Sequence, residues 1–132
     1  MLKKEVERGE QGRVILMDSI TKLTADDKGA VVVSASHGGG SSGEFALEVP
    51  LAAVFFNDAG VGKDDAGIVA LGMLQKRDTA AGTVSHTSAR IGDAQDMWDN
   101  GVISHVNEAA KRDGLAPGQS LRQALTTLVR GR

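Results

Sequence analysis

The chain has 132 residues, of which 41% are hydrophobic and 24% are charged, the proportions of one soluble globular domain. A formal net charge of −2 without runs of like charge argues against nucleic acid or an anionic membrane as a partner. The absence of cysteine excludes disulfides and thiolate metal sites. Because no apolar run approaches a membrane span and the charged N-terminus does not resemble a secretory signal, we expect a cytoplasmic protein.

The N-terminal third predicts two strands. Residues 1–12 are charged, and we expect them to be loosely attached. Two runs rich in β-branched and other apolar residues, 13–20 and 30–36, are typical of strands. Since only a polar turn separates these runs, we expect them to pair antiparallel.

The remaining chain alternates between helical and extended patterns. Pro50 ends a short helix over 43–49 that Ser41 or Ser42 would cap. The continuous apolarity of 51–56 predicts a strand that is buried on both faces. Five further elements are expected: a helix from Asp64 or Asp65 to about 77, a strand over 80–86, a turn over 94–99 that Asp93 would cap, an amphipathic helix over 102–113, and a final helix opened by Ser120.

This order of elements predicts the fold class. From residue 30 onward strands and helices alternate, which implies right-handed crossovers and parallel strands. We therefore expect a single three-layer α/β domain over 1–132, with a mostly parallel central sheet and helices on both faces. The N-terminal strand would be an edge or antiparallel strand.

Polar residues follow each predicted parallel strand. Ser36 and His37 end the first, Asn57 and Asp58 end the second, and residues 85–88 end the third. Because the carboxyl ends of neighbouring parallel strands meet at one edge of a sheet, we expect these side chains to converge on one ligand site.

The first of these loops, SHGGG, brings glycine amides to the edge. The amides of Gly38 and Gly39 would approach a ligand closely, as an oxyanion hole requires. Residues 34–38, SASHG, locally resemble the nucleophile elbow G-x-S-x-G of α/β-hydrolases, with a serine in place of the first glycine. The chain order Ser36, Asp58, His86 would suit a catalytic triad, and the alternative is that Ser36 is simply the polar end of a strand.

The second loop, NDAGVGKDD, shares Gly62 and Lys63 with the phosphate loop of nucleoside triphosphatases. Asp64 stands where that loop needs a hydroxyl, and its charge would repel phosphate, so we reject nucleotide hydrolysis. Asp58 remains as a candidate general base, with Asn57 and Lys63 as ligand-binding residues. The alternative is that Asp58 caps its own turn.

The third loop carries Ser88 and Arg90, which suit a carboxylate or phosphate group, unless Arg90 pairs with an aspartate such as Asp93. The three histidines show no metal-ligand spacing, and His105 is expected on the solvated side of its helix. We predict no metal site and no cofactor.

These patterns favour an enzyme that acts on a small anionic or polar metabolite by proton transfer or hydrolysis, as a hydrolase or lyase would. We expect Asp58, His37 and Ser36 to be catalytic, and we favour proton transfer at Asp58 over attack by Ser36. The alternative is a non-catalytic subunit of an oligomeric complex. A homo-oligomer is expected in either case, because the segment 64–77 is apolar on more sides than one sheet can cover.

Overall fold

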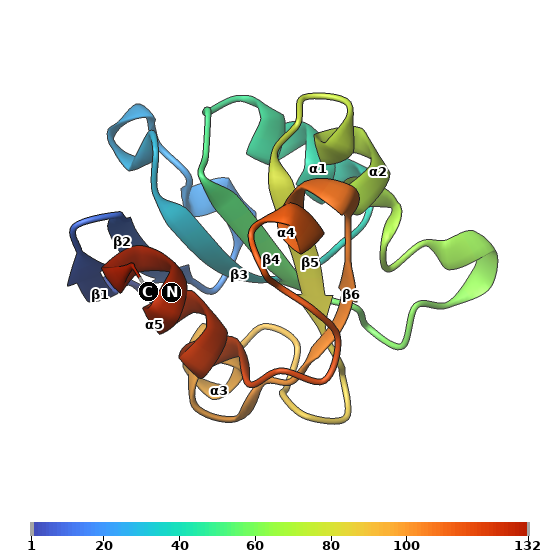
Figure 1. Cartoon of the computed structure of the whole chain (residues 1–132). Coiled ribbons are helices and arrows are strands. Elements are labelled where there is room, and N and C mark those ends of the chain that lie inside the picture. The colour runs from blue at the N-terminus through green and yellow to red at the C-terminus, as the bar shows by residue number, and fades with distance from the viewer. Residues whose placement is uncertain (1, 132) are drawn as a thin grey trace.

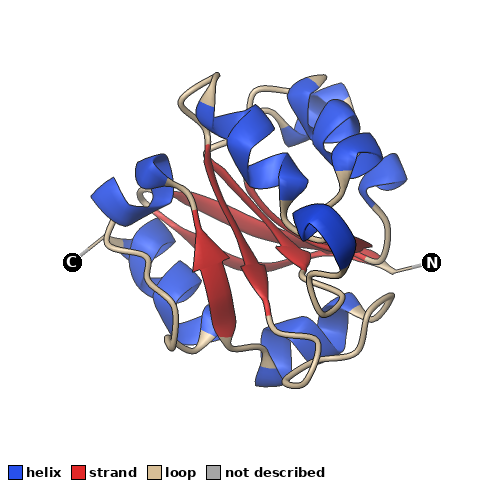
Figure 2. Cartoon of the chain, turned by 90° about the vertical axis from the view of Figure 1, so that its right-hand side faces the viewer, coloured by secondary structure: helices blue, strands red, loops and turns tan. Residues whose placement is uncertain are grey.

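The computed structural model describes residues 2–131 and shows one six-stranded sheet with helices around it (Figures 1 and 2). The strands lie side by side in the order of the chain: β1 (Lys3–Gly9), β2 (Gly12–Met17), β3 (Val31–His37), β4 (Ala53–Asn57), β5 (Ala80–Val84) and β6 (Ile103–Val106). Strands β2 to β5 are parallel, whereas β1 and β6 run antiparallel at the two edges. The prediction of a mixed fold with a mostly parallel centre is confirmed.

Within residues 2–131, five α-helices and three 3₁₀ turns connect or follow the strands. The helices are α1 (Gly40–Leu47), α2 (Val69–Gln75), α3 (Ala94–Asn100), α4 (Glu108–Arg112) and α5 (Leu121–Arg130), and the 3₁₀ turns are η1 (Ile20–Lys22), η2 (Ala25–Asp27) and η3 (Lys63–Asp65). Within the described residues, no helix is long and apolar enough to cross a membrane.

Two apolar clusters hold the sheet to its helices. Alternate residues of β3 divide between them, because successive side chains of a strand point to opposite faces. Val31 and Val33 join the cluster that contains Trp98 of α3 and Leu125 of α5. Val32 joins the cluster that contains Ala46 of α1 and Leu74 of α2. Both sides of the central strands are therefore buried, which explains their unbroken apolar sequence.

The pairing predicted for the N-terminal third is wrong. Residues 3–9 are not loosely attached but form β1, which pairs antiparallel with β2 across a tight turn. The second and third strands are parallel, because the 13 residues between Met17 and Val31 contain two 3₁₀ turns and are long enough for a crossover. The polar β1 takes the edge of the sheet instead.

The helix predicted over 102–113 is also wrong. Its first half is strand β6, which pairs with β5, and only residues 108–112 are helical. Asn107 separates the two: its Oδ1 accepts hydrogen bonds from the N–H groups of Ala81 and Ala110, each at 3.0 Å. Its Nδ2 donates to the carbonyls of Leu71 and Thr79. Residues 103–106 therefore form a strand at the edge of β5, although the spacing of their apolar residues favours a helix.

Two predicted helix starts move. Helix α1 begins at Gly40 with Gly39 as its N-cap, and neither Ser41 nor Ser42 caps it. The segment after Lys63 makes a 3₁₀ turn before α2 begins at Val69, because Asp64 and Asp65 have left-handed φ angles of 55° and 58°. The caps predicted for the later helices are confirmed: Asp93 accepts from Asp96 N–H and Ser120 accepts from Gln123 N–H.

Candidate functional site

A cluster of polar side chains lies at the edge of the sheet where β4 and β5 end. Asp58 follows β4, His86 follows β5 by two residues, and His105 lies on the neighbouring strand β6. Between Asp58 and α2, the chain forms a loop that extends away from the body of the molecule, drawn light green at the right of Figure 1. We call Asp58, His86, His105, Thr83 and Ser104 the rim cluster.

Asp58 is the centre of the rim cluster. Only 4% of this residue is exposed, although it ends a strand at the surface. Its Oδ1 accepts hydrogen bonds from the backbone N–H groups of Gly60 at 2.8 Å and His86 at 3.1 Å. Asp58 therefore does cap its own turn, and it also fixes the loop that follows β5.

The charge of Asp58 is retained despite its burial. Desolvation raises the pKa of the carboxyl group, but the N–H of Gly60, the hydroxyl of Ser104 and the N–H of His86 lower it, and the net pKa lies below its ordinary value. A carboxylate with a lowered pKa is a weak proton acceptor near neutral pH. Asp58 is therefore better suited to orient and stabilise a neighbouring group than to act as the general base.

Two imidazoles face this carboxylate. The Nδ1 of His86 lies 3.4 Å from Asp58 Oδ1, and the Nδ1 of His105 lies 4.0 Å from Asp58 Oδ2. Their side chains are 54% and 39% exposed, so both rings contact the buried carboxylate at one end and solvent at the other. A carboxylate beside an imidazole recurs at general-base sites. Here the separations are those of ion pairs, and no hydrogen bond joins Asp58 to either ring among the described residues.

Two hydroxyl groups complete the rim cluster. Thr83 Oγ1 lies 2.8 Å from Ser104 Oγ, and the Nδ1 of His105 lies 3.3 Å from the first oxygen and 3.2 Å from the second. Thr83 is fully buried, while Ser104 and His105 are partly exposed.

The backbone around the rim cluster is packed too tightly for side chains at two glycines. A Cβ atom on Gly67 would lie 1.9 Å from the carbonyl oxygen of Asp58, and one on Gly38 would lie 2.5 Å from the carbonyl oxygen of Gly67. The loops that follow β3 and β4 are therefore in direct contact. Nearby, Ala59 and Val61 adopt left-handed φ angles of 51° and 66°, a conformation that costs free energy and is common at functional loops.

The structure brings some of the predicted site residues to this edge and directs others elsewhere. Asn57 is buried and structural: its Nδ2 donates to Ala89 O and its Oδ1 accepts from Ala59 N–H. The imidazole of His37 lies against Gly39, on the exposed end of β3. Lys63 is exposed on the protruding loop, and no ion pair joins it to another described residue.

Three other predicted residues make local contacts. The hydroxyl of Ser36 accepts a hydrogen bond from Ile20 N–H at 3.1 Å, and no hydrogen bond joins it to a histidine in the described chain. Ser88 connects its loop to the start of β6, because its hydroxyl donates to Ser85 O and accepts from Val102 N–H. The backbone N–H of Arg90 donates to Asp96 Oδ2 at 2.8 Å, a bond that lowers the pKa of this carboxyl group. The salt bridge of the alternative interpretation is not seen, because no ion pair of the described residues includes the Arg90 side chain.

Sequence reasoning missed Thr83, Ser104 and His105. Because His105 was expected on the solvated side of a helix, its position near Asp58 was not predicted. The dipeptide Ser104-His105 offered one signal, since both residue types recur beside carboxylates in catalytic sites. Only the pairing of β6 with β5 could have placed them there.

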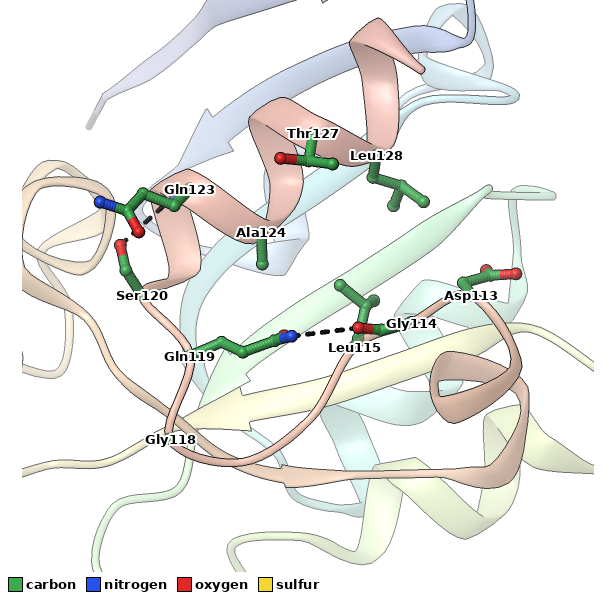
Figure 3. Close-up of a pocket in the computed structure, with 10 residues that line it drawn as sticks. All are labelled: Asp113, Gly114, Leu115, Gly118, Gln119, Ser120, Gln123, Ala124, Thr127 and Leu128. Carbon is green, nitrogen blue, oxygen red and sulfur yellow. Dashed lines mark hydrogen bonds between the residues drawn. The ribbon is translucent and has the colours of Figure 1, made fainter. Parts of the chain in front are cut away.

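A hollow of the surface lies away from the rim cluster. It is an open groove of about 570 Å³ between α5 and residues 113–120 (Figure 3). Leu115, Ala124 and Leu128 form its apolar wall, and Asp113 is its one titratable residue. It therefore offers little acid–base chemistry. Among the described residues, no group of three or more histidines and acidic residues is placed to hold a metal ion.

The comparisons with known proteins give no family or neighbour. No protein-family model matches the chain, and no curated protein or solved structure is significantly similar to it. We therefore infer the function from the geometry of the rim cluster.

Proposed function

We propose that this protein binds a small polar or anionic metabolite at the carboxyl edge of its sheet and transfers a proton to or from it. The base is the His86 imidazole, and the Asp58 carboxylate orients it and stabilises its protonated form. The observation that carries the proposal is the 3.4 Å contact between a buried carboxylate of lowered pKa and a ring that is half exposed to solvent.

The roles follow from the burial of each group. Asp58 has little access to solvent and is held by backbone donors, so it cannot reach a substrate but can interact with an imidazolium. The His86 side chain is 54% exposed, so a bound molecule can contact its ring. Lys63, on the protruding loop, supplies a positive charge that would favour an anionic ligand.

Proton transfer is favoured over nucleophilic hydrolysis by Ser36. A serine nucleophile needs a base within hydrogen-bond reach, and the Ser36 hydroxyl is bonded to the backbone of Ile20 instead.

We also infer the three-layer arrangement that the sequence led us to expect, with helices on both faces of the sheet. The two apolar clusters support this arrangement.

A ligand-observed NMR screen in D₂O tests the proposal. The probes are a panel of small keto acids, hydroxy acids and sugar phosphates, and the readouts are binding and exchange of carbon-bound hydrogen for deuterium. We expect His86→Gln to slow exchange by about 10²- to 10⁴-fold. Asp27→Asn is the matched control, because Asp27 is equally buried but precedes β3, whereas Asp58 follows the parallel strand β4, so the two lie at opposite ends of the sheet. Exchange that survives His86→Gln would refute the proposal.

A second candidate function, that of a non-catalytic subunit, has one observation in its favour. Phe45 of α1 and Val69 of α2 are 39% and 42% exposed, and these two helices pack together. An apolar surface of this kind suits contact with another protein chain, including a second copy. Light scattering at micromolar concentration tests whether the chain forms a homo-oligomer. A monomer mass would rule out a homo-oligomer, whereas a dimer that dissociates in the Phe45→Ser and Val69→Ser variants would support one.

A further inference from the structure

The first turn of helix α1 leaves backbone amides without partners. Gly39 is the N-cap of this helix of 8 residues, and no side chain caps it. The N–H of Gly38 donates to Asn57 O at 3.1 Å, whereas no hydrogen bond of the described chain uses the N–H groups of residues 39–42. Such amides point out of the start of a helix, where they and the helix dipole favour a negative charge.

The same turn contains a hydroxyl group without a partner on a buried residue. Ser42 is 5% exposed and lies on the inward side of α1, one turn before Ala46 of the apolar core. No hydrogen bond of the described chain includes its hydroxyl, although every fully buried side-chain oxygen or nitrogen of that chain has a partner. The Ser42 oxygen is therefore accessible to solvent. Because the Cα–Cβ bonds of a helix tilt toward its N-terminus, this oxygen opens at the amide end of α1.

Glycines allow a ligand to reach this turn. Gly38, Gly40 and Gly43 have the spacing G-x-G-x-x-G between strand β3 and helix α1. Packing requires two of them, because a Cβ on Gly38 would lie 2.5 Å from Gly67 O and one on Gly43 would lie 2.7 Å from Met73 Sδ. A Cβ on Gly40 would meet nothing within 4 Å. The middle glycine therefore leaves open space beside the free amides, as it does in phosphate-binding turns of this spacing.

We propose that the N-terminal turn of α1 binds the phosphate group of a small phosphorylated compound. The amides of Gly39, Gly40 and Ser41 donate to the phosphate oxygens, and the amide and hydroxyl of Ser42 supply further donors. This set of donors matches the several acceptor oxygens of a phosphate better than the two oxygens of a carboxylate. No acidic side chain lies in the first turn of α1 to oppose the charge.

The neighbouring strand favours a phosphate monoester over a nucleotide. In dinucleotide-binding domains, an acidic residue about 20 positions after the glycine turn binds the ribose. Asp58, after β4, occupies the corresponding place, but it is 4% exposed and its Oδ1 accepts from the N–H groups of Gly60 and His86. The Asp58 carboxylate thus holds the loops of the protein together. The turn therefore offers a site for phosphate without a site for ribose.

The phosphate site adjoins the rim cluster. A Cβ on Gly38 would lie 3.3 Å from Thr83 Cγ2, so the turn before α1 contacts the strand that leads to His86. Only β4 separates β3 from β5, a distance of about 10 Å. A sugar phosphate is long enough to place its phosphate at α1 and a carbon-bound hydrogen near His86. This assignment of the substrate as a phosphorylated metabolite rests on the proposed function, whereas the phosphate site itself does not.

The test is a titration of the full-length, ¹⁵N-labelled protein with inorganic phosphate at constant ionic strength, followed by the chemical shifts of its amides. We expect saturable shifts centred on residues 39–42. Gly40→Leu, whose side chain would fill the open space, and Ser42→Ala, which removes a hydrogen bond to a charged group, should each weaken binding by about tenfold or more. Gly72→Leu is the matched control, because Gly72 of α2 is also exposed with nothing within 4 Å of its Cβ position. This variant should bind phosphate as the wild type does.

Shifts that do not saturate, or binding that Gly40→Leu leaves unchanged, would overturn the inference. ADP that binds more tightly than ribose 5-phosphate would overturn the choice of a monoester over a nucleotide. The amide spectrum shows whether each variant is folded, and Gly40→Leu supplies the test if Ser42→Ala is not. The proposed function fails separately: phosphate binding without deuterium exchange refutes catalysis and keeps the site, whereas exchange without phosphate binding refutes the site and keeps catalysis.

Discussion

The loops at Asp27 and Asp58 each contain an aspartate that is 4% exposed and whose pKa is lowered, yet their surroundings differ. Asp27 Oδ2 accepts from the Lys3 ammonium at 2.9 Å and from Thr24 N–H at 2.8 Å. This pair holds the edge strand β1 to the turn before β3. The groups that donate hydrogen bonds to Asp27 therefore serve to connect β1 with the turn before β3.

Asp58 has the same burial but a different set of neighbours. Its backbone donors come from its own turn and from the loop after β5, and no lysine or arginine pairs with it among the described residues. Two imidazoles that also face solvent lie against it instead. Burial and a lowered pKa are therefore shared by both aspartates, and the two loops differ in the groups that surround the carboxylate.

Substitution of glycine by alanine should give the largest difference in stability between the Asp58 loop and the Asp27 loop. We expect Gly67→Ala to destabilise the protein by about 3 kcal/mol, because the added Cβ would meet the carbonyl oxygen of Asp58, which cannot rotate away. Gly29→Ala, near Asp27, has open space and only a left-handed φ of 80° to overcome, for about 1 kcal/mol. Urea denaturation measures both, and equal losses would show that the Asp58 turn is no more constrained than the other.

Asp27→Asn should cost stability and leave the ligand site intact. We expect a loss of about 1–2 kcal/mol, because the charge-assisted bonds from Lys3 and Thr24 are weakened. Lys3→Met should cost a similar amount, and the double variant less than the sum, in a double-mutant cycle. An Asp27→Asn protein that loses deuterium exchange while it remains folded would contradict the separation of the two roles.

Acid should remove what the Asp27 charge contributes. Because the folded pKa of Asp27 lies below its unfolded value, the unfolded chain binds protons first as the pH falls. The contribution is therefore complete above the ordinary aspartate range, near pH 4, and is lost as the pH drops through the folded pKa. Urea midpoints of wild type and Asp27→Asn should differ at pH 6.5 and converge as the pH falls through the folded pKa of Asp27. A difference in urea midpoint that does not change with pH would show that the substitution acts through packing and not through the charge of Asp27.

Ser36→Ala should have the smallest effect of these changes. The substitution removes one hydrogen bond from Ile20 N–H, which is worth about 1 kcal/mol, and no group of the rim cluster. We expect deuterium exchange to be unchanged and a fluorophosphonate probe to leave Ser36 unlabelled. Labelling that depends on Ser36 would restore the nucleophilic alternative and weaken the contrast drawn for Asp58.

Local sequence patterns were enough to establish the mixed α/β class with a mostly parallel centre and two residues of the rim cluster, Asp58 and His86. Unbroken apolar runs such as 51–56 required strands buried on both sides, and alternation with helical segments required parallel neighbours. Asp58 was recognisable because polar residues that end a buried strand lie at the edge of the sheet. Local signals also sufficed for the caps at Asp93 and Ser120, because a cap needs only the neighbouring turn.

The other residues of the rim cluster could not be predicted from local patterns, because their positions depend on contacts between segments that are distant in the sequence. Residues 103–106 carry a helical period but became a strand when the edge of β5 was available to pair with them. That pairing, with its extra residue at Ser104, brought His105 and two hydroxyl groups to Asp58 from another part of the chain. Register is a property of two strands together, so no stretch of sequence taken alone could have specified it.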